Sequence, residues 1–467
     1  MASFLSLILD SNSGFMKSVL SIIIISLSFV SFANEDSLFI RKIYDEALEK
    51  GQAHDNLRSL CKDIGARITG SAEAKMAVQW GKNLLESYEF DKVYLQEIQV
   101  PHWERGTKEA GWMINEAGEV FKFHMIALGG SVGTDGLIEG DVLAVESIEE
   151  LEELGEEKVK GKIVFFNRPF DQKQIQTFRA YGGCIAQRHE GTNAASKLKA
   201  AGVIIRSLGS STDDHPHTGS MHYEAGVDSV AGAAISTKDS DLLNSWLEKG
   251  KVKVKMEMDC RHYPEETSHN VIAEMKGSKD DNIITFGGHL DSWDVGEGAH
   301  DDGAGIVHSI EALRILKELG YKPKHTLRCV LFMNEENGNF GGTNYARLAS
   351  EAKEKHICAI ETDRGGFLPI GFDVSGSEEQ LAMVRQFAPL LKAFQLYKFD
   401  PGYSGVDVRP MLEYYPEMIQ LGMSISSQRY FDFHHAESDV FENVNKRELH
   451  LGAAAMATMI YLLDKNL

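Results

Sequence analysis

The chain is short of cysteine and of basic residues. Its 467 residues include only five cysteines, an odd count without close spacing, which excludes a disulfide framework. Cys329 and Cys358 lie in apolar runs, so we expect them to be buried thiols. Lysine and arginine number 48 against 69 aspartate and glutamate residues, which gives a formal net charge of -21. Because phosphate binding needs clustered basic side chains, this charge argues against a nucleic-acid partner, and it disfavours attachment to an anionic membrane surface.

Long apolar runs are also scarce, and the one candidate lies near the start of the chain. Met16-Lys17 precedes an apolar run from Val19 to Val30, and Ser31-Phe32-Ala33 then has the small-x-small pattern of a signal-peptidase site. The run is shorter than the ~20 residues that a membrane span needs, which favours a cleaved signal over a transmembrane anchor. The sequence therefore predicts an exported protein, secreted or periplasmic, cleaved after Ala33 and without stable membrane insertion. Residues 1–15 read as an upstream extension from a wrongly chosen start codon.

Length and composition allow a soluble protein with more than one module. An apolar content of 43% with 25% charge is ordinary for a globular chain, and 467 residues suffice for two domains or for one large domain with an insertion. Helical periodicity near both ends encloses a stretch of short β-like runs. We therefore expect a larger domain in two parts and an insert between them. The bounds are 1–33 for the signal, 34–119 and 258–467 for the larger domain, and 120–257 for the insert.

Two segments of the insert resemble a protease-associated domain, a non-catalytic module that is common in exported peptidases. They are GKIVFFNRP at 161–169 and KLKAAGVIIRS at 197–207. The whole chain is accordingly predicted to be α/β, with a mixed central sheet flanked by helices and an inserted β-rich domain of this type. The insert also carries metal-type side chains from Asp213 to His217 and at His222, for which a solvated loop is the favoured interpretation.

A glycine-rich stretch with many ligand-type residues runs from Gly287 to Gly305 and reads GGHLDSWDVGEGAHDDGAG. It follows an apolar run, Ile283 to Phe286, that predicts a buried strand, and it leads into helical periodicity from Ile306 to Leu319. Open α/β sheets place their sites in loops beyond the carboxyl ends of strands. We therefore expect the chemistry of the chain to lie here.

Further ligand-type residues follow other predicted strands or lie near the end of the chain. Strand ends lie side by side in a parallel sheet, so segments far apart in the sequence can converge. Imidazole and carboxylate ligands without thiolate suit zinc in an open catalytic site. The chain has more candidate ligands of this kind than the three protein ligands that one catalytic zinc uses. This predicts two zinc ions ~3.5–4 Å apart that share a carboxylate. The set is His289, Asp291, Asp301, Asp302, Glu335, Glu336, Asp363, His434 and His435.

The order of these motifs resembles one enzyme family. A His-x-Asp pair, an aspartate in a DDGAG loop, a Glu-Glu pair, an aspartate and a late histidine are similar to the motifs of the co-catalytic two-zinc exopeptidases, which include bacterial aminopeptidases and glutamate carboxypeptidases. The resemblance covers the chain from about Phe39 onward. It implies five metal ligands, a general base and a supporting acid. The implied ligands are His289 and Asp363 for one zinc, Glu336 and His435 for the other, and Asp301 as the bridge, with Glu335 as general base and Asp291 as hydrogen-bond partner of the His289 ring.

Some assignments stay open at the level of sequence. The family's spacing to a following aspartate, here Asp439, favours His435 over its neighbour His434, but the sequence alone does not separate the two. Arg364 follows a ligand and could meet a substrate carboxylate, although pairing with a neighbouring acid is favoured. The loop from Pro401 to Asp407 is either a plain glycine turn or a wall of the pocket. The candidate substrate contacts are Tyr403, Ser404, Arg364 and His434.

Taken together, the motifs predict an exported dinuclear zinc exopeptidase that hydrolyses dipeptides or short peptides with a zinc-activated water and Glu335 as general base. The first alternative is a zinc aminopeptidase of the same family. A non-catalytic, receptor-like homologue is a further alternative, against which the complete ligand set speaks. The expected partner is a small peptide substrate, and a homodimer is compatible with the sequence.

Overall fold

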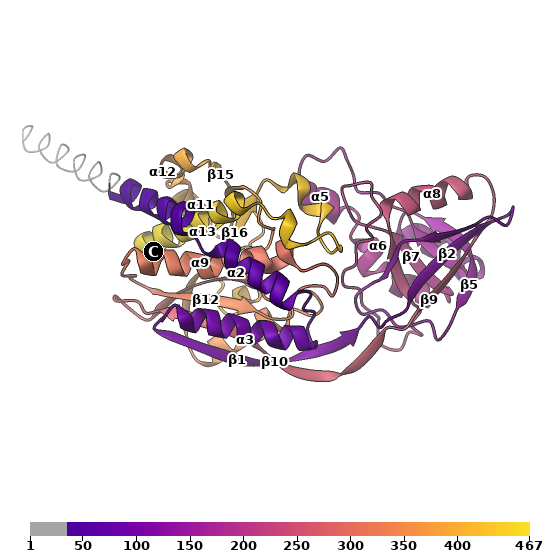
Figure 1. Ribbon diagram of the computed structural model, residues 1–467, viewed down its shortest axis with the longest axis horizontal. Coiled ribbons are helices and arrows are strands. Elements are labelled where there is room, and N and C mark those ends of the chain that lie inside the picture. Colours follow the sequence, from indigo (N-terminus) through magenta and orange to yellow (C-terminus); the bar gives the residue numbers. More distant parts are fainter. Residues whose placement is uncertain (1–34) are drawn as a thin grey trace, which may run out of the picture.

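The computed structural model describes residues 35–467, so the predicted signal at 1–33 and its cleavage after Ala33 lie outside the described residues. Within residues 35–467 the strands form two eight-stranded sheets, which belong to two modules joined by long strands (Figure 1). No helix of this part of the chain has the length and apolar character needed to cross a membrane. All five cysteines are free and buried, as the sequence indicated for Cys329 and Cys358.

The larger sheet is mixed, as predicted. Its strand order is β1-β10-β12-β11-β13-β16-β14-β15. The central strands β12, β11, β13 and β16 are parallel, while β10 joins β12 and β14 joins β16 in antiparallel fashion. Parallel neighbours bring their carboxyl ends to one edge, which is where the site lies. The strands are β1 (Lys92–Glu104), β10 (Arg261–Met275), β11 (Asn282–His289), β12 (Thr326–Phe332), β13 (Lys355–Glu361), β14 (Pro369–Ser375), β15 (Lys398–Pro401) and β16 (Ile419–Ile425).

Helices cover both faces of this sheet because its strands alternate apolar side chains between two cores. On β12, Cys329 and Leu331 belong to the core under α3, α9 and α13, whereas Val330 and Phe332 belong to the core under α10. Helix α9 is buried from Ala304 to Leu316, and it packs between the sheet and α13. The helices are one over 35–50, α2 (Ala53–Ser59), α3 (Ala72–Ser87), α9 (Ala304–Glu318), α10 (Phe340–Glu351), α11 (Glu378–Arg385), α12 (Ala388–Leu391) and α13 (Lys446–Asn466).

The insert forms the second module, with strand order β3-β2-β9-β5-β6-β7-β8-β4. Strand β2 lies before the boundary expected at residue 120, yet it pairs with β9 and belongs to this sheet. The protease-associated character of the module stays a prediction. Its strands are β2 (Glu109–Asn115), β3 (Val120–Phe123), β4 (Met125–Ala127), β5 (Ile138–Val145), β6 (Ile163–Phe166), β7 (Gly202–Arg206), β8 (Gly232–Ile235) and β9 (Val252–Met258), and its helices are α4 (Ile148–Val159), α5 (Thr177–Gly182), α6 (Ala186–His189), α7 (Gly191–Lys197) and α8 (Thr237–Leu247).

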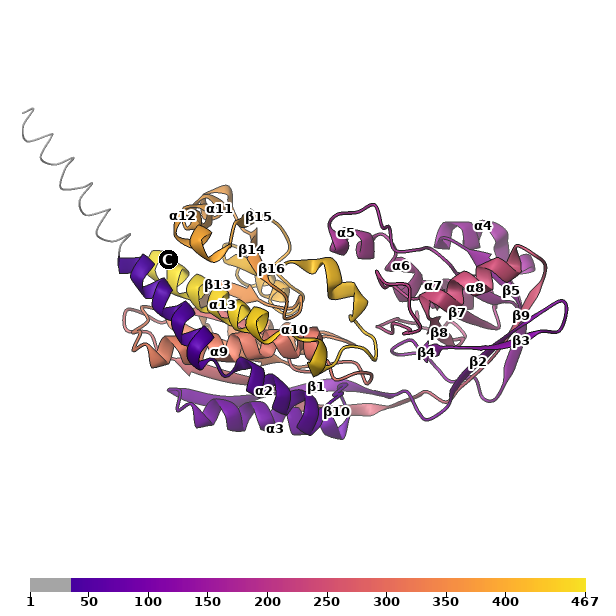
Figure 2. The same ribbon diagram turned by 45° about the horizontal axis from the view of Figure 1, so that its top comes forward.

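Two connections bring the modules together. The paired strands β1 and β10 run out of the larger sheet and carry the insert at their ends, with Glu104 still opposite Arg261 (Figure 2). The segment before α13 reaches back toward the insert, where the backbone N–H of Ser210 donates to the carbonyl of Phe431 at 3.1 Å. The insert therefore lies over the edge at which the parallel strands end.

Gly287 on β11 is a position where the central sheet tolerates no side chain. A Cβ atom there would lie 2.0 Å from the carbonyl oxygen of Val330 on β12. We predict that Gly287→Ala lowers the free energy of unfolding by about 1–3 kcal/mol, because the strand must shift to relieve the overlap. Gly182→Ala is the matched control, since nothing lies within 4 Å of a Cβ at that site. Denaturant unfolding of both variants checks this, and equal stabilities would contradict it.

Candidate metal centre

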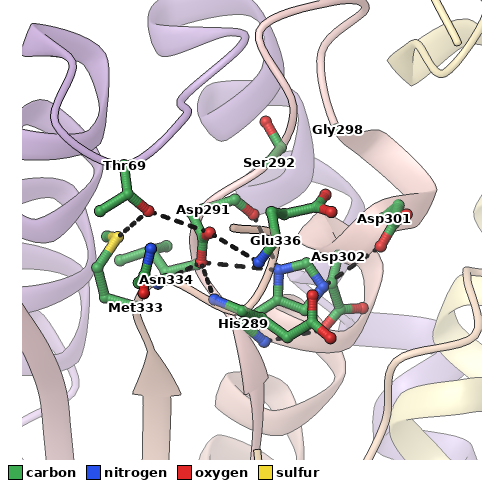
Figure 3. A network of polar contacts seen from close by, with 12 residues as sticks. Thr69, His289, Asp291, Ser292, Gly298, Asp301, Asp302, Met333, Asn334 and Glu336 are labelled. Atoms are coloured by element: carbon green, nitrogen blue, oxygen red, sulfur yellow. Dashed lines mark hydrogen bonds and ion pairs between the residues drawn. The ribbon is translucent and has the colours of Figure 1, made fainter. Parts of the chain in front are cut away.

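The predicted ligand residues reach one place from five segments of the larger module. His289 is the last residue of β11, Glu336 follows β12, and Asp363 follows β13. Asp301 lies in the turn between β11 and α9, and His435 lies in the loop before α13. Figure 3 shows His289, Asp301 and Glu336 pointing toward one another at the ends of the strands. The structure thus gathers the side chains that parallel topology was expected to bring together.

Asp301 lies between two pairs of residues. Its Oδ1 atom is 3.3 Å from Nε2 of His289, which is in turn 3.5 Å from Oδ1 of Asp363. Its Oδ2 atom is 3.2 Å from Nε2 of His435, which is 3.2 Å from Oε2 of Glu336. Each oxygen of the Asp301 carboxylate thus faces an imidazole that also contacts a second acid, and Nε2 of His434 lies 3.6 Å from Oδ2 as well. This is the arrangement that a bridging carboxylate requires.

The donor atoms at the centre fit divalent metal. Four of them are buried without a hydrogen-bond partner: Nε2 of His289, Oδ2 of Asp301, Oε1 of Glu336 and Oδ1 of Asp363. Buried polar atoms without partners are costly, and coordination would satisfy all four. Asp302 also lies close to His289, but its oxygens accept from the backbone N–H groups of His289 at 3.1 Å and Gly305 at 3.0 Å. Asp302 therefore holds the turn, although with His289 and Asp363 it also forms a group that could hold a metal ion.

The charges at the centre act strongly on one another. Burial lowers the pKa of His289, but its contacts with Asp301 and Asp363 outweigh burial and hold that pKa well above the ordinary value. Burial raises the pKa of Asp301, but contacts with His289 and His435 outweigh it and hold that pKa well below the ordinary value. Burial and the charge of Asp301 raise the pKa of Glu336 to about 6. Acids packed this closely require positive charge among them.

Asp291 supports the centre differently from the expectation. The ring of His289 uses Nδ1 to donate to the backbone carbonyl of Asp291 at 3.0 Å, while the nearer carboxylate oxygen is 3.8 Å away. The carboxylate instead accepts from three successive backbone N–H groups, those of Asn334 at 2.7 Å, Glu335 at 3.1 Å and Glu336 at 3.2 Å. Asp291 therefore fixes the loop that carries both glutamates (Figure 3).

Two residues that sequence reasoning missed or undervalued hold the Asp301 turn. Arg67 is fully buried, and its guanidinium donates to the carbonyls of Leu290 at 2.6 Å and Gly298 at 3.0 Å. No motif surrounds Arg67, and its partners are backbone atoms, so the sequence carries no signal for this role. Asp439 was noted only for its spacing, yet its carboxylate accepts from the backbone N–H of Asp301 at 3.1 Å.

Some of the predicted substrate contacts are already hydrogen-bonded within the protein, and others are available to a ligand. Arg364 pairs with Asp373 at 2.6 Å, the structural alternative that the sequence favoured, and it also donates to the carbonyl of Tyr403 at 2.8 Å. The Ser404 hydroxyl is buried and donates to Gln420 at 2.8 Å. Tyr403 is 45% exposed and remains available to a ligand. The ring of His434 stacks on that of His435 with centroids 3.6 Å apart, beside the centre.

The insert contributes to the centre directly. The carbonyl of Thr218 lies 3.2 Å from Nδ1 of His435, and its backbone N–H donates to the carbonyl of His435 at 2.9 Å. His217 was expected in a solvated loop, but it is buried and its Nδ1 donates to the carbonyl of His434 at 2.7 Å. This module therefore orients His435, a predicted ligand from the larger module.

The strand ends of a mixed sheet bring imidazoles and acids together around one shared aspartate. This arrangement defines the class of protein as a metal-dependent hydrolase. Comparison with known proteins places it more narrowly. The chain belongs to peptidase family M28, whose sequence profile matches residues 270–460. It is thus a metallopeptidase.

The similar proteins agree with this assignment. Carboxypeptidase Q of Mus musculus is 32% identical over 89% of this chain and 86% of its own length, and that of Homo sapiens is 32% identical over 90% and 86%. This confirms the likeness to plasma glutamate carboxypeptidase, or carboxypeptidase Q, that GGHLDSWDVG and Phe433-His434-His435 indicate. A crystal structure of a peptidase M28 precursor from Shewanella amazonensis is 30% identical, with a TM-score of 0.87, over 92% of this chain and 97% of that one. An aminopeptidase from Aneurinibacillus, 20% identical with a TM-score of 0.61 over 90% and 95%, shares the fold.

We predict that Asp291→Ala weakens zinc affinity by about 10- to 100-fold, because the Glu335–Glu336 loop loses the acceptor of its three N–H groups. Thr69→Val is the control. It removes only a hydroxyl that donates to the same carboxylate at 3.2 Å and leaves the loop contacts in place. Competition titration with a zinc chelator measures both affinities. Unchanged affinity in Asp291→Ala would show that the loop keeps its position without this carboxylate.

Proposed function

We propose that this protein is an exported dinuclear zinc exopeptidase that hydrolyses dipeptides or short peptides, as a carboxypeptidase of the carboxypeptidase Q type. The observation that carries the proposal is Asp301, whose two oxygens face two separate pairs of ligand-type side chains. The 32% identity to carboxypeptidase Q supports the substrate class. Export rests on the signal predicted at 1–33, and a homodimer remains a prediction.

Each zinc ion would be held by one imidazole, one acid of its own and one oxygen of Asp301. His289 and Asp363 would hold the first ion, and Glu336 and His435 the second. When bound, zinc supplies a Lewis acid that polarises the scissile carbonyl and lowers the pKa of water. Thr218 and Asp291 fix the ligand rings by accepting from their Nδ1 atoms, which leaves each Nε2 free for metal.

Glu335 is the residue that moves the proton. Its backbone N–H is fixed by Asp291, and burial raises the pKa of its side chain well above the ordinary value. In its ionised form this carboxylate can take a proton from the attacking water and then release it to the leaving amine. Its neighbour Glu336 faces His435 and is committed to the metal. The two adjacent acids therefore have different tasks.

Glu335→Gln is predicted to retain zinc and to lose turnover by about 10²- to 10⁴-fold, since the amide cannot accept the proton. Glu351→Gln, an exposed change on α10, is the matched control and is expected to keep wild-type turnover. Steady-state hydrolysis of a dipeptide, with zinc content measured on the same samples, checks this. Near-normal turnover of Glu335→Gln would remove Glu335 from the role of general base.

Metal analysis tests the number of ions. We predict about two zinc ions per wild-type chain and about one in His435→Ala, because that change strips one of the two pairs around Asp301. His215→Ala is the control, since His215 is exposed and pairs with Glu437 outside the centre. A single zinc per wild-type chain would contradict the dinuclear proposal while leaving a metallopeptidase.

An aminopeptidase of the same family is the second candidate, and one observation favours it. Asp407 is fully buried, and neither of its carboxylate oxygens has a hydrogen-bond partner in residues 35–467. The charges of Glu361 and Asp363 act on it, so acids gather on the His289 side of the centre. Such a place suits a substrate ammonium group. Hydrolysis of N-blocked against C-blocked dipeptides separates the two candidates, because an aminopeptidase accepts only the latter.

A further inference from the structure

A second group of ligand-type side chains lies in the insert, apart from the candidate metal centre. His189 is the last residue of α6, Glu190 follows it, and His222 lies in the connection between β7 and β8. One donor atom of each of these residues lies within 4.8 Å of those of the other two. In the sequence His222 stands near the ligand-type run from Asp213 to His217, but the fold places it beside two residues much earlier in the chain.

Glu190 lies between the two imidazoles, with one carboxylate oxygen facing each. Its Oε1 atom is 2.9 Å from Nδ1 of His189, and its Oε2 atom is 3.4 Å from Nε2 of His222. The two rings have their centroids 5.0 Å apart. Two ligand atoms bound about 2.0–2.1 Å from one ion lie about 2.9–3.4 Å from each other, depending on the coordination geometry. The separations therefore fit a single ion without rearrangement of the backbone.

The carboxylate of Glu190 has no permanent counter-ion. Within residues 35–467 it pairs with no lysine or arginine, and histidine is largely neutral at pH 7. The other ligand-type group of the insert differs in this respect. There Asp214 pairs with Lys238 at 2.9 Å, and Asp239 accepts from the backbone N–H of His124 at 2.6 Å. Only the group at Glu190 thus combines two imidazoles with an acid that is not otherwise neutralised.

We propose that His189, Glu190 and His222 bind a divalent transition-metal ion, and Cu²⁺ most tightly. Two imidazoles and one carboxylate suit ions of this class, and Cu²⁺ leads the order of affinity for nitrogen and oxygen ligands. All three side chains are 44–45% exposed, so the ion keeps water ligands and exchanges with solution. The site is separate from the buried centre proposed to hold zinc, and it does not depend on the proposed peptidase function.

An ion at this site joins two segments of the insert that contact His435. Arg188 directly precedes His189, and its Nη1 atom lies 3.2 Å from Nδ1 of His435. Thr218 comes shortly before His222, and its carbonyl oxygen lies 3.2 Å from the same nitrogen. Because the ion fixes α6 against the 218–222 segment, it stabilises the part of the insert that lies against the centre.

Copper titration of the zinc-loaded protein tests the site. Loading with zinc first fills the centre, and glycine in the buffer removes copper from weak single-histidine sites. We expect one Cu²⁺ per chain whose electron paramagnetic resonance spectrum shows coupling to two nitrogens. His222→Ala should keep its zinc but weaken copper affinity by at least about 10- to 100-fold, since loss of a mere supporting partner of a ligand already has an effect of that size.

His215→Ala is the matched control. His215 is an exposed histidine of the same module that faces an acid, Glu437, at 2.7 Å. It belongs to no three-ligand group in the part of the chain that the structure describes. Its removal should therefore leave the affinity for copper and the two-nitrogen spectrum as in the wild type.

Two further measurements separate ion binding from folding. Glu190→Gln keeps the shape of the side chain and both imidazoles, so it should weaken copper binding while the two-nitrogen coupling remains. Copper should also raise the midpoint of thermal unfolding of the wild type more than that of His222→Ala. Equal copper affinities of the wild type and His222→Ala would overturn the proposal, as would copper that only displaces zinc. None of these readouts uses peptide hydrolysis, so they hold or fail independently of the proposed function.

Discussion

The structure depends on the concentration of acids and imidazoles at one buried edge of a sheet. Parallel strands β11, β12 and β13 end side by side, so each adds an ionisable side chain to the same small volume. Asp301 completes the group from the following turn, and its carboxylate contacts both His289 and His435. Such a group is expensive without cations, which makes metal binding part of what the fold must accommodate. The buried residues Arg67, Asp291 and Asp439 support this group, since each fixes the backbone of a segment that carries a predicted ligand.

The two modules are in contact at the candidate metal centre, and they are also connected by the polypeptide chain. Strands β1 and β10 carry the insert to the edge where the parallel strands end, and the carbonyl of Thr218 from the insert accepts from Nδ1 of His435, a predicted ligand. A movement of the insert would therefore change the orientation of a ligand ring. This couples the position of the insert to the orientation of the His435 side chain in the larger module.

Much of the fold and the centre could be predicted because their signals are local. An apolar run followed by a ligand residue marks the end of a buried strand, so His289, Glu336 and Asp363 could be located before any coordinates. A side chain whose hydrogen-bond partners are backbone atoms has no recognisable pattern in the sequence. For this reason Arg67 was missed, and the carboxylate of Asp291 was assigned to the wrong partner. The start of the insert was uncertain for a similar reason, because β2 pairs with β9 far along the chain. The burial of His217 likewise depends on a contact between the two modules, which the spacing of apolar residues in the sequence does not indicate.

The central proposal is that two cations share the carboxylate of Asp301. Anomalous diffraction from zinc-loaded crystals, recorded on either side of the zinc absorption edge, locates those ions directly. We predict two peaks, one between His289 and Asp363 and the other between Glu336 and His435, with the carboxylate of Asp301 between them. A single peak, or peaks that do not adjoin Asp301, would contradict it.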